Sequence, residues 1–249
     1  MTVAPRFRLN CDLGESYGDR VVGRDSEVMP HLDQANIACG FHGGDPATLR
    51  DTITLALRHA VDVGAHPSYP DLEGFGRRSM DLEHAELVAA IHYQLSAVEG
   101  MARLQGAELA HVKPHGALYN DMMARDAVRA AVIEAVASWH RPLTLLLQAT
   151  PRHEEHALEA LAAGVSVQFE AFADRRYTDS GALQARTEAG AVLEGRAILD
   201  QVAQLLEQGT VTTSGGARIP VHAQTLCVHG DNPAGVRAIR AIRELLDRG

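Results

Sequence analysis

The chain has 249 residues, of which 46% are hydrophobic, and a formal net charge of −9. This length suits one α/β domain with a sizeable core. Because no Pro/Ser/Gly-rich linker or run of charge divides the chain, we predict a single domain over residues 1–249. An acidic chain without a basic cluster is a poor partner for nucleic acid or an anionic membrane. No apolar run approaches the ~20 residues of a membrane helix.

The N-terminal residues and the cysteines indicate the cellular compartment. Residues 1–6 contain no hydrophobic signal segment, and the three cysteines, at positions 11, 39 and 227, show no paired spacing. We therefore expect a protein of the reducing cytoplasm.

Short apolar segments that read as buried strands recur along the chain. We predict seven of them, at residues 7–10, 34–38, 61–65, 109–112, 143–148, 165–169 and 225–228. Helical apolar spacing separates them, and three helices are expected to begin at a capping residue followed by proline: Asp45-Pro46, Thr150-Pro151 and Asn232-Pro233. Residues 210–221 read as an appended hairpin, and the polar, glycine-broken stretch 71–78 reads as a candidate lid.

The regular alternation of strand and helix is typical of a parallel sheet. No strand pair is left over for a second domain, which favours a closed ring of strands. We therefore predict a single-domain (β/α)7 barrel of the TIM-barrel type. An open doubly wound sheet has the same periodicity and is the alternative.

Polar side chains follow the predicted strands at their carboxyl ends or in the loops just beyond, and none is expected inside a strand. Parallel α/β folds bind ligands and do their chemistry at this edge of the sheet. A single histidine or aspartate there more often packs or caps a helix, but five of seven strands delivering such residues together indicates a site. The candidate catalytic residues are Asp12, Glu15, His42, His66, Lys113, His115, Glu170, Asp174, His229 and Asp231.

Lys113 is the only lysine among the 23 basic residues. A bias toward arginine explains the scarcity of lysine but does not explain why a lysine is kept at this position, in the stretch His111-Val112-Lys113-Pro114-His115-Gly116. Lysine is a compact charge whose pKa responds to burial, whereas arginine is a permanently charged fork. We expect Lys113 to act on substrate from beyond its strand, outside the packed core. The alternative is that Lys113 pairs structurally with a neighbouring carboxylate such as Asp12 or Glu170.

This set of carboxylates, imidazoles and one lysine suits hydrolysis of an amide or ester. The sequence has neither a Gly-x-Ser-x-Gly nucleophile elbow nor a Gly-x-x-x-x-Gly-Lys-Ser/Thr phosphate loop, so water is the simpler nucleophile. Metal-ligand spacing such as His-Glu-x-x-His is lacking too, which leaves a tightly bound metal open. Its candidate ligands are Asp12, His42, His66 and His115.

Several long motifs resemble those of the LamB/YcsF family, and together they cover nearly the whole chain. They are Leu9-Asn10-Cys11-Asp12-Leu13-Gly14-Glu15, the stretch from Asn36 to Asp45, the stretch from Gly64 to Asp71, Gly74-Phe75-Gly76-Arg77-Arg78, the stretch from Val112 to Asn120, Phe172-Ala173-Asp174-Arg175 and Cys227-Val228-His229-Gly230-Asp231. Departures are small: Ser16-Tyr17 stands where Gly-Phe is common, and Gly43 where alanine is frequent.

The resemblance implies a barrel related to the glycoside hydrolase and deacetylase barrels. It also implies a role in opening 5-oxo-L-proline to L-glutamate at the expense of ATP, together with 5-oxoprolinase subunits B and C as partners. ATP would then be a cosubstrate, with Mg²⁺, bound by this chain or by a partner. Such a substrate is an anion, and the candidate substrate-binding residues are Asn10, Asn36, Arg77, Arg78 and Arg175.

Two other functions remain open at this point. One is a metal-dependent amide or sugar deacetylase that needs no ATP, which the histidines favour. The other is a non-catalytic subunit that binds a small acid. The sequence leaves association of the chain with copies of itself open as well.

Overall fold

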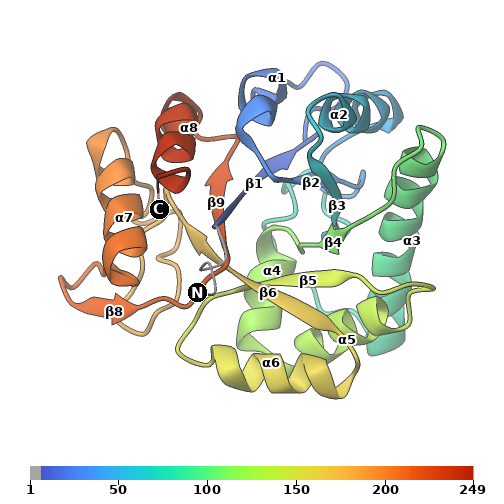
Figure 1. Ribbon diagram of the computed structural model, residues 1–249. Helices are drawn as coiled ribbons and strands as arrows, with labels where there is room; N and C mark the ends of the chain where they lie inside the picture. Colours follow the sequence, from blue (N-terminus) through green and yellow to red (C-terminus); the bar gives the residue numbers. More distant parts are fainter. Residues whose placement is uncertain (1–6, 249) are drawn as a thin grey trace, which may run out of the picture.

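Seven parallel strands close into a barrel in the computed structural model, which describes residues 7–248 (Figure 1). The strands pair in chain order from β1 to β6, and β9 completes the ring between β6 and β1. The predicted (β/α)7 barrel is confirmed, and the open doubly wound alternative is wrong. The barrel strands are β1 (Arg8–Leu13), β2 (Gln34–Ala38), β3 (Asp62–His66), β4 (His111–Val112), β5 (Thr144–Gln148), β6 (Ser166–Phe172) and β9 (Thr225–His229).

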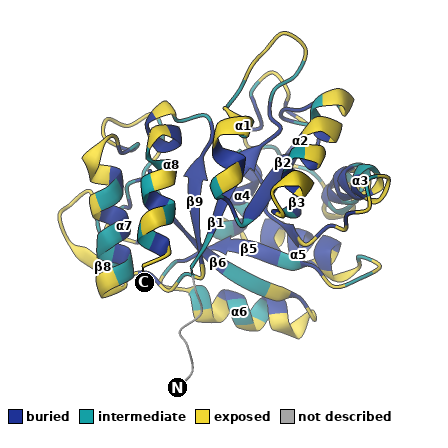
Figure 2. Ribbon diagram, turned by 45° about the horizontal axis from the view of Figure 1, so that its top comes forward, coloured by how far each residue is buried: buried dark blue, intermediate teal, exposed yellow. Residues whose placement is uncertain are grey.

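Helices surround this ring and bury one face each against it. In Figure 2 most of the strands are therefore dark, β6 is partly teal, and the outer faces of the helices are exposed. The helices are α1 (Asp25–Val28), the short 3₁₀ turn η1 (Met29–His31), α2 (Pro46–Arg58), α3 (His84–Arg103), α4 (Gly116–Ala124), α5 (Asp126–Ala137), α6 (His153–Ala162), α7 (Arg196–Gln208) and α8 (Pro233–Leu246). Within residues 7–248, no helix combines the length and the apolar character needed to cross a membrane. Residues 1–6, where we predicted no signal segment, lie outside the described range.

Two of the three predicted helix starts are confirmed. The Asp45 carboxylate accepts hydrogen bonds from the backbone N–H groups of Ala47 and Thr48 at the start of α2. Asn232 caps α8 in the same way through Ala234 N–H. The third prediction is wrong, because α6 begins only at His153 and the preceding Thr150-Pro151 forms a turn.

Other differences concern lengths and one missed helix. Strand β1 runs on to Leu13, three residues past its predicted end, because Asp12 and Leu13 continue the ladder with β2. A separate helix, α4, follows directly after His115 and was not predicted. Its start at Gly116, with φ of +55°, is a backbone turn that a non-glycine residue rarely adopts.

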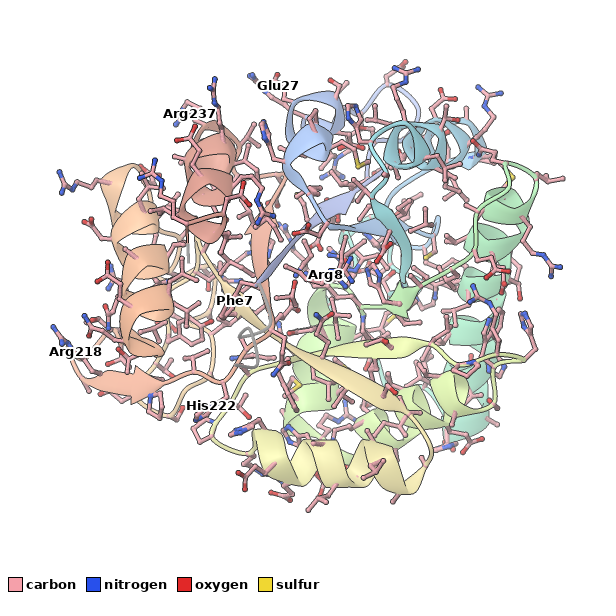
Figure 3. The ribbon with its side chains drawn as sticks, in the orientation of Figure 1. Phe7, Arg8, Glu27, Arg218, His222 and Arg237 are labelled. Atoms are coloured by element: carbon pink, nitrogen blue, oxygen red, sulfur yellow. The ribbon has the colours of Figure 1, made fainter. Side chains whose placement is uncertain are left out.

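The appended hairpin is confirmed as β7 (Thr210–Thr212) and β8 (Arg218–Pro220), which pair antiparallel beside the barrel. Figure 3 shows charged side chains projecting from the outer elements into solvent, including Glu27 on α1, Arg218 on β8 and Arg237 on α8. The three cysteines are buried and free.

Alternation along the strands makes the barrel interior polar. In β1 the side chains of Asn10 and Asp12 point inward, while Leu9, Cys11 and Leu13 pack outward against the helices. Asn10 donates to Thr225 of β9 (3.0 Å) and to Glu170 of β6 (3.3 Å). Hydrogen bonds therefore connect three successive strands of the ring, β1, β9 and β6, beneath their carboxyl ends.

Candidate active site

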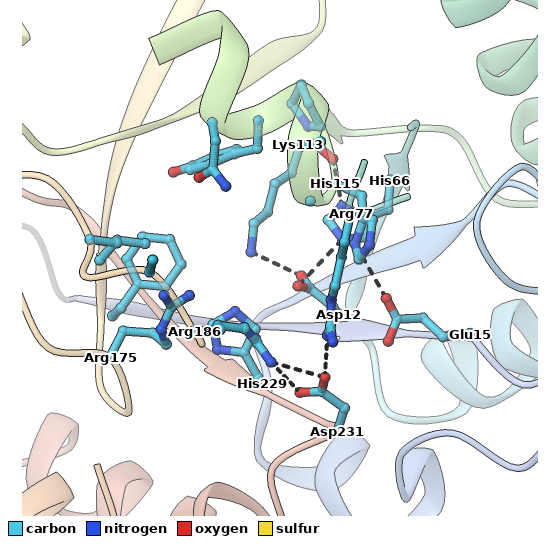
Figure 4. Close-up of a pocket in the computed structure, with 18 of the residues that line it drawn as sticks. Asp12, Glu15, His66, Arg77, Lys113, His115, Arg175, Arg186, His229 and Asp231 are labelled. Atoms are coloured by element: carbon cyan, nitrogen blue, oxygen red, sulfur yellow. Dashed lines mark hydrogen bonds and ion pairs between the residues drawn. The ribbon is translucent and has the colours of Figure 1, made fainter. Parts of the chain in front are cut away.

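A cavity of about 400 Å³ opens at the carboxyl end of the barrel, within the size range of small-molecule sites. Figure 4 shows Arg175 and Arg186 on one side of it, and Glu15 and His66 on the other. Seven of the ten catalytic candidates line it: Asp12, Glu15, His66, Lys113, His115, His229 and Asp231. Among the substrate-binding candidates, Arg77 and Arg175 also line it.

The remaining candidates lie outside the cavity wall. His42 and Asp174 are buried behind it, and Asn10, Asn36 and Glu170 lie beneath it in the barrel interior. Arg78 is turned away and pairs with Asp71. Our prediction that no candidate lies inside a strand is wrong for Asp12 in β1 and Glu170 in β6, because both strands extend further than their apolar residues indicated.

Lys113 is at the centre of the ion pairs below the cavity. Its side chain is 4% exposed, and its ammonium lies 2.9 Å from Asp12 Oδ1, 3.2 Å from Glu170 Oε2 and 3.1 Å from Cys227 Sγ. Burial acts to lower the pKa of Lys113, but Asp12, Cys227 and Glu170 outweigh it and raise the pKa well above its ordinary value. Our expectation that Lys113 lies outside the packed core is therefore wrong.

Asp12 is held between a lysine and a histidine. Besides Lys113, its carboxylate contacts His66 Nε2 at 3.3 Å and accepts a hydrogen bond from Asn36 Nδ2 at 2.9 Å. Burial acts to raise the pKa of Asp12, but the charges of His66 and Lys113 hold it well below the ordinary value. Asp12 is thus an ionised carboxylate that faces the cavity at neutral pH.

Three histidines and Glu15 form a second cluster, the histidine cluster, at the cavity wall. His115 Nδ1 lies 3.0 Å from His66 Nε2 and 3.4 Å from Glu15 Oε1, and His42 Nε2 lies 3.2 Å from the same oxygen. The rings of His42 and His115 stack in parallel, 3.7 Å apart. Three different parts of the barrel deliver these histidines: His66 is the last residue of β3, whereas His42 and His115 lie in the loops after β2 and β4.

Burial sets the protonation of this cluster. It lowers the pKa of both His42 and His115 well below the ordinary value, so both rings are neutral. Burial also raises the pKa of Glu15 to about 8, an effect that the nearby charge of Asp12 strengthens. Among residues 7–248, no lysine or arginine forms an ion pair with Glu15.

The loop 71–78, predicted as a lid, is folded against the histidine cluster. Phe75 is buried edge-on to the rings of His42 and His115, and its carbonyl oxygen accepts a hydrogen bond from His115 Nε2 at 2.9 Å. A Cβ on Gly76 would come within 2.8 Å of both histidines. The loop therefore fixes the orientation of His115 in this structure.

Arginines line the other side of the cavity. Asp231 pairs with Arg77 (2.6 Å) and Arg186 (3.1 Å), as the dashed lines in Figure 4 mark. Burial acts to raise the pKa of Asp231, but Arg186, His229 and Arg77 hold it below its ordinary value. Nearby, His229 Nδ1 contacts Asp174 Oδ1 at 2.9 Å.

Arg175 differs from these two arginines because it forms no ion pair with any described residue. It is 7% exposed, its Nη2 donates to the Gln184 carbonyl oxygen at 2.6 Å, and its Nε has no hydrogen-bond partner within residues 7–248. Burial lowers its pKa to about 10. A buried, uncompensated guanidinium at a cavity wall is a suitable anchor for an anion.

Sequence reasoning missed several cavity residues, among them Arg186 and Tyr119. Arg186 lies in irregular chain between β6 and α7, where no strand end marks it as part of the site. Tyr119 lies on α4, the helix that was not predicted. Burial raises the pKa of Tyr119 well above its ordinary value, as does the neighbouring Glu170. The position of Tyr119 within the stretch from Val112 to Asn120 was the one sequence signal that could have placed it in the site.

Comparison with known proteins identifies close relatives. The second 5-oxoprolinase A subunit of Pseudomonas putida is 50% identical over 248 residues, covering 98% of this chain and 95% of that protein. The 5-oxoprolinase A subunit of Vibrio parahaemolyticus is 49% identical over 245 residues, covering 98% and 97%.

Solved structures agree with the fold. The crystal structure of a lactam utilization protein from Thermus thermophilus has a TM-score of 0.89 and 38% identity, covering 98% of this chain and 96% of that one. A family 4 carbohydrate esterase from Streptomyces lividans, at 12% identity and a TM-score of 0.51 over 98% and 88% of the two chains, shares only the fold. The LamB/YcsF family model matches residues 7–249, and the chain therefore belongs to the LamB/YcsF family.

Proposed function

We propose that this chain is the lactam-opening subunit of an ATP-dependent 5-oxoprolinase, which converts 5-oxo-L-proline, ATP and water to L-glutamate, ADP and phosphate. The names of its relatives support the substrate. The observation that carries the proposal is one cavity lined by an uncompensated cation, Arg175, and by the Asp12–Lys113–His66 constellation.

Arg175 is the proposed anchor of the substrate carboxylate. The substrate brings one negative charge, which would complete the hydrogen bonding of a guanidinium that lacks a carboxylate partner among the described residues. Arg77 and Arg186 are already neutralised in part by Asp231, and their role is to hold the two loops of the cavity mouth together.

The reactive groups suit attack by water on an activated amide. Asp12, ionised and exposed to the cavity, is the proposed general base that takes a proton from water. The ammonium of Lys113 is fixed beside it, where its charge stabilises the negative charge that develops on the oxygen of the attacked carbon. His66, in contact with Asp12, orients the base.

ATP makes this reaction feasible because a five-membered lactam is a poor electrophile. Transfer of the γ-phosphoryl group to the lactam oxygen gives an imidoyl phosphate and ADP. One water then adds to the ring carbon and the ring C–N bond breaks, with a proton going to the amine, which gives γ-glutamyl phosphate. A second water attacks this acyl phosphate and releases L-glutamate and phosphate. The sequence has no phosphate loop. We therefore propose that ATP, with Mg²⁺, is bound by partner subunits B and C or at their interface with this chain.

The direct test is glutamate release from 5-oxoproline and ATP by the purified chain, with and without subunits B and C. We expect turnover only in the full mixture, with ADP and glutamate formed in equal amounts. Robust turnover by this chain alone would contradict the division of labour. No turnover in the full mixture, with the corresponding protein of Pseudomonas putida as positive control, would contradict the function itself.

A deacetylase that needs no ATP is the second candidate, favoured by the three histidines and Glu15 at the cavity wall. It predicts release of acetate from N- or O-acetylated sugars by the chain alone. Assay of both reactions in the same preparation, with and without ATP, separates the two functions.

A further inference from the structure

Backbone carbonyl groups determine which nitrogen carries the proton in two histidines of the histidine cluster. His66 Nδ1 lies 2.6 Å from the carbonyl oxygen of Lys113, and His115 Nε2 lies 2.9 Å from that of Phe75. A carbonyl oxygen only accepts, so both of these nitrogens must be N–H donors. The nitrogens left to bind a ligand are therefore His66 Nε2 and His115 Nδ1.

These two nitrogens face each other at 3.0 Å. At that distance they share a cation, either a proton or a metal ion. Glu15 Oε1 lies 3.4 Å from His115 Nδ1, and the four ligand atoms of Glu15, His42, His66 and His115 all lie within 4.8 Å of one another. The cluster has the donors of a cation site, and no lysine or arginine of residues 7–248 pairs with its carboxylate.

The spacing matches a coordination shell. Ligands about 2.0–2.1 Å from a tetrahedral zinc ion are about 3.3 Å from each other. The measured separations of 3.0 and 3.4 Å bracket this value. The carbonyl groups that orient His66 and His115 are the kind of outer partner that metal-bound histidines have.

We propose that Glu15, His66 and His115 bind a divalent transition-metal ion of the zinc class at the cavity wall, with His42 as the positioning residue. Two imidazoles and one carboxylate suit Zn²⁺, Co²⁺ or Fe²⁺ better than the all-oxygen shell of Mg²⁺ or Ca²⁺. All three ligands line the cavity, whereas His42 lies behind them, stacks on His115 and places its Nε2 3.2 Å from Glu15 Oε1. A three-ligand site with one side toward a cavity is the arrangement of catalytic rather than structural zinc.

A comparison within the same cavity supports this choice. Asp12, Cys227 and His229 also place three ligand atoms close together. There, however, the ammonium of Lys113 lies 2.9 Å from Asp12 and 3.1 Å from Cys227, so a cation is already supplied. Figure 4 shows the Lys113 side chain directed at Asp12, while Glu15, His66 and His115 group together without a lysine.

The test measures metal rather than activity. The full chain, purified without chelators and without a histidine tag, is analysed for metal by mass spectrometry. It is then stripped with a chelator and titrated with Co²⁺, whose visible absorption reports a four- or five-coordinate nitrogen–oxygen site. We expect about one ion per chain and one Co²⁺ site.

Glu15→Gln and His66→Gln should each weaken Co²⁺ binding by about 100-fold or more, and His42→Gln by about 10- to 100-fold. His84→Gln, an exposed histidine on α3, is the control and should bind as the parent does. Circular dichroism of each variant separates loss of the site from loss of the fold. Absence of a Co²⁺ spectrum in the folded parent chain would overturn the proposal and leave a proton shared by His66 and His115. Unchanged affinity in folded Glu15→Gln and His66→Gln variants would overturn this choice of ligands.

Discussion

Replacing Lys113 by methionine removes the charge below the cavity and keeps the length of the side chain. In the parent, the ammonium lies 2.9 Å from Asp12 and 3.2 Å from Glu170, and all three side chains are less than a tenth exposed. The variant leaves two buried carboxylates without their cation. Breaking a buried ion pair in this way costs about 3–5 kcal/mol of unfolding free energy.

For a chain of this size, one kcal/mol corresponds to roughly 2–4 °C in Tm. The Tm of Lys113→Met should therefore fall by about 6–20 °C. Turnover of 5-oxoproline in the mixture with subunits B and C should fall by about 100-fold or more, because a charge beside the developing oxyanion is lost.

A double variant separates the structural role of Lys113 from its chemical one. Lys113→Met combined with Glu170→Gln removes one of the two orphaned carboxylates, so we expect about 1–2 kcal/mol of the lost stability to return. Activity should not return with it. Recovery of both stability and turnover would mean that Lys113 acts only as a structural cation, and the assigned role would be wrong. A Tm within error of the parent in the single variant would refute the electrostatic reasoning.

Three further perturbations test other parts of the site. Arg175→Lys should raise the KM for 5-oxoproline by about 10- to 100-fold with a smaller change in kcat, because one bidentate contact to the substrate carboxylate is lost. Arg176 does not line the cavity, so Arg176→Lys is the control in the same steady-state assay. The fold lowers the pKa of Asp231, so the ionised side chain stabilises the folded state at pH values above its unfolded pKa of about 4. This stabilisation is lost as the pH falls through the folded pKa. Asp231→Asn should therefore lower Tm near neutral pH and flatten its acid dependence; an unchanged acid limb would exclude this role. Gly116→Ala places a Cβ 2.5 Å from a carbonyl oxygen of the loop 71–78 and should make that loop more sensitive to protease. Gly106→Ala is the control, because Gly106 also has a positive φ but a Cβ there would meet no atom within 4 Å. Equal cleavage of the loop in the two variants would count against a loop held by close packing.

The order of strands and the edge that carries the chemistry were predictable from local patterns. Apolar runs mark buried strands whatever the tertiary context, and a cap such as Asp45 acts on its own nearest helical residues. Seven of the catalytic candidates reached the cavity for the same reason: a residue at the carboxyl end of a parallel strand, or just beyond it, faces that edge in any barrel.

The contacts that the sequence did not predict are those made by the ends of long side chains. Lys113 follows its strand, yet its ammonium reaches across the interior to β1 and β6, where apolar periodicity carries no information. Asp12 looked like a loop residue because a polar side chain inside a strand usually ends the apolar pattern, and this barrel has a polar interior. Arg186 had no neighbouring strand to place it.

The closure of the barrel makes the site a product of the entire chain. Asp12 of β1 pairs in register with His229 of β9, and β9 joins β1 to β6, so the first and last strands lie side by side. During synthesis, the seam can close only after its last strand is made: Asn10 and Thr225, which bond across it, are 215 residues apart. A nascent or C-terminally shortened chain would expose the edges of β1 and β6 and their polar interior, which favours slow, late closure and pairing with other chains. The same seam offers a route for engineering: joining the two ends and opening the ring at an exposed helix connection would retain every barrel contact and change only the order in which the strands are made.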